Sequence, residues 1–136
     1  MGQLQGLIEY LSSNYKNVVE IGIGSYAKIA MALQERGLSV VATDIQRRTV
    51  DIPVVLDDVR VPNLDLYRDA EAIYSVRPPL EMVPSLKRLA EHLAKDLIIK
   101  PLAAEPVDGL LINRAGSFFY LFRSTKKPSY QPSSLP

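Results

Sequence analysis

Two glycines, Gly22 and Gly24, stand between an apolar run and a helical pattern in the segment VVEIGIGSYAKIA (residues 18–30). Where a strand turns into a helix, glycine lets the backbone bend sharply and lets a ligand approach closely. The helix that follows offers free N–H groups and a partial positive charge, both of which suit an anionic group. The segment therefore predicts a nucleotide-binding turn, with Ser25 as the helix N-cap and a member of the site.

Acidic residues end the neighbouring apolar segments. Asp44 follows Gly24 by 20 residues, a place from which a carboxylate can accept hydrogen bonds from both hydroxyls of a ribose. Asp57 and Asp58 close the next apolar segment. We expect one of this pair, with a slight preference for Asp57, to contact the ligand and the other to serve the turn.

Glu20 is the acid that distinguishes between ligands. A carboxylate inside an apolar strand is costly unless it is paired or hydrogen-bonded. It would repel a pyrophosphate but attract an ammonium or sulfonium group, so we expect Glu20 to belong to a site for a cationic cofactor. The alternative is a structural bond to a backbone N–H or to a lysine at the strand end.

Alternating strand and helix patterns must position these residues. Strands are predicted at residues 17–21, 39–44, 52–58, 72–76 and 96–100, and a hairpin at 109–123. Helices are predicted at residues 4–15 and 26–36, and a short one at 63–70. A further helix is predicted from the spacing of its apolar residues, Met82, Leu86, Leu89 and Leu93. Such alternation gives a parallel sheet with right-handed crossovers. We therefore expect an α/β, three-layer, Rossmann-like sandwich with a C-terminal antiparallel hairpin. Residues 1–123 would form one domain with an N-terminal helix, and residues 124–136 a disordered tail.

Two families of nucleotide-binding motif fit the glycine segment. GIGSYA matches G-x-G-x-x-A, the dinucleotide fingerprint, and the segment EIGIG is similar to the first motif, E/D-x-G-x-G, of S-adenosylmethionine (SAM) dependent methyltransferases. The order of elements, including the final hairpin, resembles a reduced class I methyltransferase. That resemblance implies SAM held near Glu20, Gly22 and Gly24, the ribose at Asp44, and the adenine amino group at Asp57 or Asp58. The chain also resembles a small uncharacterised archaeal protein family with a Rossmann-type fold.

The segment after the fourth predicted strand departs from one methyltransferase pattern. Amino-group methyltransferases often carry Asn/Asp-Pro-Pro-aromatic there, whereas this chain has Arg77, Pro78, Pro79 and Leu80. Arginine cannot accept a hydrogen bond, which disfavours methylation of adenine or cytosine by that route. Arg77 instead suits the carboxylate or phosphate of an acceptor substrate. The alternative is a surface pair with Glu81.

Composition narrows the remaining classes. A chain of 136 residues with a net charge of +1 fits one domain and has no overall field that indicates nucleic acid or an anionic membrane as a partner. With no cysteine and one histidine, thiolate and histidine-cluster metal sites are excluded, and we expect no metal. No apolar run approaches the roughly 18 residues of a membrane span, and no signal peptide is evident, so a cytoplasmic location is expected.

Three functions remain open. The first is a SAM-binding protein, a candidate methyltransferase for which the sequence identifies neither catalytic residue nor acceptor. The second is a non-catalytic regulatory domain that binds NAD(H), and the third a degenerate fold that binds a partner, in which Tyr26 would close the turn. Because the predicted connections are short, the site should be open unless a second copy or another protein covers it.

Overall fold

The computed structural model describes residues 2–101 and 108–124. Its helices are α1 (Gly2–Asn14), α2 (Lys28–Glu35) and α3 (Val83–Leu93), with the short 3-10 turns η1 (Leu64–Leu66) and η2 (Leu80–Met82). Its strands are β1 (Asn17–Ile21), β2 (Ser39–Asp44), β3 (Val54–Leu56), β4 (Ala72–Val76), β5 (Asp96–Lys100), β6 (Leu110–Arg114) and β7 (Ser117–Phe122). The expected disordered tail falls, from residue 125 on, outside the described residues.

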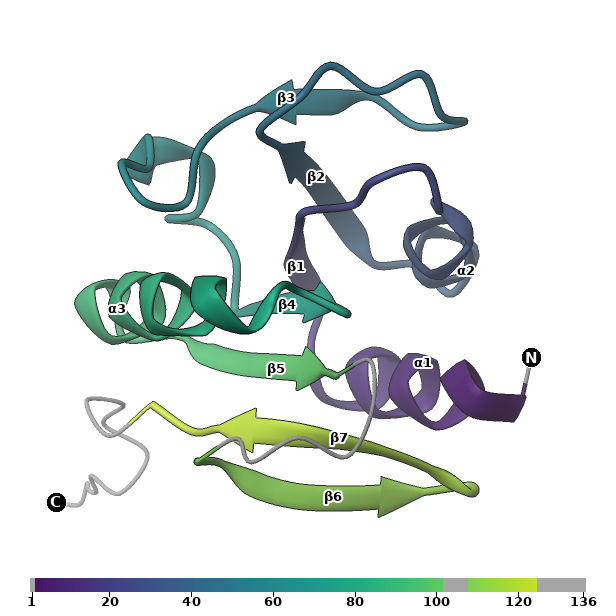
Figure 1. Cartoon of the computed structure of the whole chain (residues 1–136). Helices are drawn as coiled ribbons and strands as arrows, with labels where there is room; N and C mark the ends of the chain where they lie inside the picture. The colour runs from purple at the N-terminus through teal and green to yellow at the C-terminus, as the bar shows by residue number, and fades with distance from the viewer. Residues whose placement is uncertain (1, 102–107, 125–136) are drawn as a thin grey trace, which may run out of the picture.

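One seven-stranded sheet, in the order β3-β2-β1-β4-β5-β7-β6, forms the middle of the molecule (Figure 1). Strands β1 to β5 pair in parallel, whereas β7 runs antiparallel between β5 and β6. The order of the parallel strands reverses between β1 and β4. Ligands of open α/β sheets bind at the carboxyl ends of the strands near such a reversal, so the topology points to the residues that follow β1 and β4.

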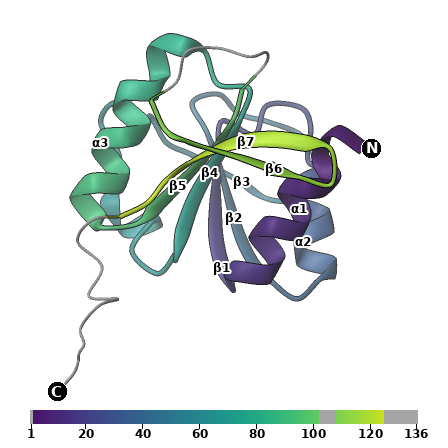
Figure 2. The same ribbon diagram turned by 90° about the horizontal axis from the view of Figure 1, so that it is seen from below.

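Helices cover both faces of the sheet, α1 and α2 on one side and α3 on the other (Figure 2). On the α1 face, Leu11 and Leu33 pack against Phe119 of the hairpin in one buried cluster. On the α3 face, Leu86 and Leu89 pack against Ile73 and other strand residues in a second cluster. Strands buried on both faces are expected to be continuously apolar, as β4 and β5 nearly are. The expected three-layer Rossmann-like fold is confirmed.

Most predicted elements are confirmed, and the structure departs from the prediction mainly in the extent of three of them. The third strand is only Val54–Leu56, since Pro53 cannot donate to the ladder and the pairing with β2 ends where the N–H of Asp57 donates to the carbonyl of Asp44. Residues 63–70 form only the 3-10 turn η1, and α2 begins at Lys28 rather than at residue 26. Pro84 lies in the first turn of α3, where the missing N–H costs nothing. Within the described residues, no helix is long and apolar enough to span a membrane.

Candidate functional site

A cavity of about 340 Å³ lies at the carboxyl ends of β1, β2, β3 and β4, where the strand order reverses. Its lining includes six residues that the sequence singled out, namely Gly22, Gly24, Asp44, Asp57, Asp58 and Arg77. The apolar part of the wall comes from Ile21, Val59, Pro78, Met82 and Leu86, among others. An apolar wall with a few convergent polar groups is typical of a small-molecule site. We refer to this cavity as the strand-end pocket.

The glycine turn at the pocket is clamped to the end of β2. The N–H groups of Gly22 and Ile23 both donate to the carbonyl of Thr43, at 2.9 and 3.2 Å. Gly22 and Gly24 have φ angles of 74° and 63°, and a Cβ on either would meet no atom within 4 Å. Glycine is therefore needed for the backbone conformation, and the space above the turn is open to a ligand.

Asp44 holds this turn and faces the pocket at the same time. Its Oδ2 accepts from the N–H of Gly24 at 2.8 Å, and its Oδ1 accepts from the N–H of Gln46 at 2.9 Å. The Nε of Arg48 lies 3.3 Å from Oδ1. A carboxylate has about four acceptor positions, so a preoriented Asp44 keeps capacity for a ligand hydroxyl.

Asp57 and Asp58 both line the pocket, but their partners differ. Asp57 accepts from the N–H of Asn63 at 2.9 Å and from the hydroxyl of the buried Tyr67, and so fixes the loop that follows β3. Asp58 is paired with Arg60, whose Nε and Nη2 donate at 3.0 and 2.8 Å. These bonds from Arg60 hold the pKa of the Asp58 carboxyl below its usual range. The negative charges of Asp44 and Asp58 are thus neutralised by Arg48 and Arg60, which also line the pocket.

Arg77 differs from the other two cations of the lining, Arg48 and Arg60, because no ion-pair partner is found for it within residues 2–101 and 108–124. The expected alternative, a pair with Glu81, is not present there. Its backbone N–H donates to the carbonyl of Lys100, and it has a φ angle of 55°, a left-handed conformation that arginine rarely adopts. Strained residues of this kind gather at ligand sites.

The strain at Arg77 gives a stability prediction. A left-handed conformation costs a residue with a Cβ about 1 kcal/mol, and glycine avoids that cost. We therefore expect Arg77→Gly to be more stable than Arg77→Ala by about 1 kcal/mol, although glycine is usually the less stable of the two. Urea unfolding of the two variants, which lack the same guanidinium, measures the difference. Equal stabilities, or a more stable alanine variant, would contradict the strain.

Glu20 is not brought to the pocket. It lies on the α1 face of β1, where the hydroxyl of Tyr74 donates to its Oε1 at 2.7 Å. Its partner is therefore a phenol, neither the lysine nor the backbone N–H of the alternative expectation. Burial raises the pKa of Glu20 to about 8, against the opposing effect of the Tyr74 hydrogen bond. At neutral pH this carboxyl is mostly protonated and adds no fixed negative charge to the site.

Ser25 and Tyr26 also lie outside the pocket lining. The prediction that Ser25 caps the following helix is wrong, because the N-cap of α2 is Ala27 and no side chain caps it. The chain first makes a turn in which the N–H of Tyr26 donates to the carbonyl of Ile23, which delays the helix. The Tyr26 ring packs against the α1-face cluster and does not close the pocket.

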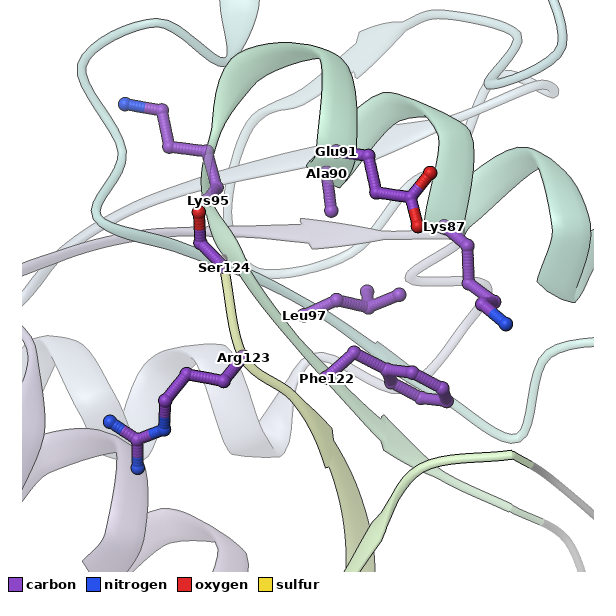
Figure 3. Close-up of a pocket in the computed structure, with 8 residues that line it drawn as sticks. All are labelled: Lys87, Ala90, Glu91, Lys95, Leu97, Phe122, Arg123 and Ser124. Atoms are coloured by element: carbon purple, nitrogen blue, oxygen red, sulfur yellow. The ribbon is translucent and has the colours of Figure 1, made fainter. Parts of the chain in front are cut away.

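Two further hollows carry fewer signs of a small-molecule site. One, of about 260 Å³, lies between α3 and the end of β7 (Figure 3). Its floor is Leu97 and Phe122, while the side chains of Lys95 and Arg123 extend away from that floor, and Lys95 Nζ donates to the carbonyl of Arg68. The other is a wider groove beside Arg88 and His92. No group of three or more potential metal ligands occurs in the described parts of the chain.

The end of the fourth predicted strand places Ser75 beside the pocket, as expected from the sequence, whereas Arg48 and Arg60 were not assigned to the site. Ser75 is buried and lines it while its Oγ donates to the carbonyl of Ile21 at 2.8 Å, which joins β4 to β1 at the reversal. Arg48 and Arg60 line it as the partners of Asp44 and Asp58. Arg48 follows Asp44 by four residues and Arg60 follows Asp58 by two, and these short spacings could have indicated the two ion pairs. The hydrogen-bond partner of Ser75 could not be predicted, because Ile21 lies on a strand 54 residues away.

Comparisons with known proteins agree on a family. The model of the uncharacterised protein family UPF0146 matches residues 3–124. A UPF0146 protein of Archaeoglobus fulgidus is 38% identical over 120 residues, which cover 86% of this chain and 92% of that protein. A UPF0146 protein of Pyrococcus furiosus is 38% identical over 130 residues, which cover 90% and 98% of the two chains. Both organisms are archaea, as the resemblance in the sequence implied.

A solved structure of MppP, soaked with the product 2-ketoarginine, is similar over 65% of this chain and 24% of that chain. The sequence identity is 20% and the TM-score 0.39.

Proposed function

The chain belongs to the uncharacterised protein family UPF0146, and from its strand-end pocket we propose that it binds S-adenosylmethionine. The observation that carries the proposal is the position of the pocket. It lies at the strand-order reversal, with the open space above Gly22 and Gly24 on one side and the Asp44 carboxylate on the other. A nucleoside with a free ribose fits such a wall, since the glycines allow close approach and Asp44 accepts hydroxyl hydrogen bonds.

Two features support SAM over a dinucleotide. The volume of about 340 Å³ is at the lower end for ligand pockets and suits one nucleoside better than two. The lining includes no residue of the loop 25–27 and none of α2, although a pyrophosphate is normally bound at that helix N-terminus. The antiparallel β7 adds support, because the dinucleotide fold has a sixth parallel strand in its place. The charge of Glu20, in contrast, no longer supports SAM.

The proposed roles follow the geometry. Asp44 would accept from the ribose hydroxyls, Gly22 and Gly24 would contact the amino-acid part, and Asp57 or Asp58 would lie near the adenine amino group. Arg77, without an ion-pair partner in the described parts of the chain, would bind the carboxylate or phosphate of an acceptor. Histidine, lysine and cysteine are missing from this lining, and its three carboxylates are already bonded. A methyl transfer here would therefore rely on in-line positioning of an acceptor that is already nucleophilic.

Calorimetric titration with SAM, S-adenosylhomocysteine and NADH tests the proposal. We expect micromolar binding of both adenosyl ligands and weaker binding of NADH. Micromolar binding of NADH without binding of S-adenosylhomocysteine would replace SAM by the dinucleotide as the ligand. No binding of any of the three would overturn the proposal.

Substitution of Asp44 identifies the ribose contact. Asp44→Ala should weaken S-adenosylhomocysteine binding by about 1–3 kcal/mol, because the hydroxyls lose a charged acceptor. Asp51→Ala is the control, since Asp51 is exposed and outside the lining. Because Asp44 also bonds Gly24, circular dichroism melting must show that the variant is folded. A folded Asp44→Ala protein with unchanged affinity would remove Asp44 from the site.

A further inference from the structure

Strand β6 leaves one long edge of the sheet without a partner strand among residues 2–101 and 108–124. The other edge strand, β3, has only three residues and follows Pro53, and short strands and prolines are the usual protection of an edge. The five residues of β6 include no proline or lysine, and Leu110 and Leu111 are 59% and 56% exposed. An unprotected apolar edge of this kind is a template for another strand.

The hairpin turn determines which backbone groups of β6 face outward. Ala115 and Gly116 have φ angles of 52° and 79°, which identifies a two-residue type I′ turn between Arg114 and Ser117. In such a hairpin the pair next to the turn is hydrogen-bonded, and bonded pairs then alternate along the strands. Residues 110, 112 and 114 therefore bond β7, while the N–H and C=O groups of Leu111 and Asn113 point away from it.

The charges on this strand are complementary to those of a second, antiparallel copy. Asp108 precedes the strand and Arg114 ends it, both are exposed, and neither has an ion-pair partner among the described residues. Six residues of extended chain separate them by about 20 Å, so they cannot pair with each other. In an antiparallel pair of β6 strands with Leu111 on the two-fold axis, Asp108 of each copy lies opposite Arg114 of the other.

The same register satisfies the backbone and the apolar side chains. Leu111 faces its own copy across the axis as a hydrogen-bonded pair, and Leu110 lies opposite Ile112 on the α1 face. A register with Ile112 on the axis would instead set Leu110 opposite Arg114 and Asp108 opposite Gly116. We propose that two copies of this chain associate through antiparallel pairing of β6 about Leu111, so that the two sheets become continuous. An isologous contact of this kind closes at two copies.

Sedimentation velocity of the full chain over a concentration series tests the dimer. The wild-type protein should show a monomer–dimer equilibrium. Leu111→Lys should leave a monomer, because it sets two ammonium groups against each other on the axis. Val61→Lys, at a residue that is 76% exposed and outside β6, is the control and should dimerise like the wild type. A wild-type monomer at all concentrations, or a dimer that survives Leu111→Lys, would overturn the interface.

Charge reversal tests the register. Asp108→Arg creates two like-charge contacts and should raise the dimer dissociation constant by about tenfold. The double variant with Arg114→Asp restores both pairs in reversed order and should recover most of the affinity. Arg114 also lies 5.5 Å from the Tyr10 ring, so the double variant is compared with Arg114→Asp alone. Dissociation constants that do not change with these charge reversals would overturn this register. Strand β6 contributes no residue to the strand-end pocket, so dimerisation and cofactor binding are measured separately.

Discussion

Replacing Glu20 by glutamine is expected to stabilise the protein above pH 8 by up to about 5 kcal/mol, because the native state holds a buried carboxyl with a pKa of about 8. The ordinary pKa of this group is 4.5, so between these two values the native state keeps a proton that the unfolded chain releases. Stability of the wild-type protein therefore falls as the pH rises through this window and levels off above it. Glutamine has no proton to lose and does not contribute this slope.

The physical cause lies in the surroundings of the carboxyl. Glu20 is 2% exposed, and the bond from Tyr74 compensates only part of its lost hydration. Glutamine keeps an oxygen that can accept from the same hydroxyl. Near pH 5 the two proteins should thus differ little, and the gap should widen as the pH rises towards 8 and stay constant above that.

Urea unfolding of both proteins between pH 5 and pH 9.5 measures the effect. Glu35→Gln is the matched control, since it makes the same substitution at an exposed position on α2. Parallel stability curves for the wild-type and Glu20→Gln proteins would show that the native carboxyl is ionised at neutral pH. In that case Glu20 would carry the negative charge that was expected from the sequence to favour a cationic ligand.

Gly6→Ala is expected to destabilise the protein by about 3 kcal/mol or more, through overpacking. Helix α1 lies so close to the hairpin that a Cβ on Gly6 would be 1.9 Å from the carbonyl oxygen of Arg114 and 2.3 Å from Ser117 Oγ. The first of these is a backbone atom, so the helix or the hairpin must move. Intrinsic helix propensity predicts the opposite sign, since alanine is favoured over glycine by about 1 kcal/mol inside a helix.

Thermal and urea unfolding, followed by circular dichroism, show whether Gly6→Ala lowers or raises the free energy of unfolding. Ser13→Ala, an exposed position in the same helix, serves as the control for propensity and should be close to neutral. If Gly6→Ala proved as stable as the wild type, α1 could not lie against the hairpin at this distance. The packing of the α1 face would then differ from the one described.

The type and order of the elements could be predicted from the sequence. Strands at residues 17–21, 39–44, 72–76 and 96–100 agree with the structure to the residue, because each is an apolar, largely β-branched run whose pattern is local. The same holds for Pro84, which fixes the start of α3 through the geometry of a single ring. The glycine turn, Asp44, the Asp57–Asp58 pair and Arg77 were placed at one edge by parallel topology alone, and they line one pocket.

Only the tertiary structure decided what each of these side chains contacts. Glu20 lies within the motif that suggested a cationic cofactor, yet a tyrosine 54 residues away binds it on the opposite face of the sheet from α3. Asp44 holds Gly24 across two strands, and Gly6 is required by a hairpin more than 100 residues later. Local sequence patterns determine which segments form helices and which form strands. The burial of a side chain, its pKa and its close contacts depend instead on which distant segments the crossovers bring together.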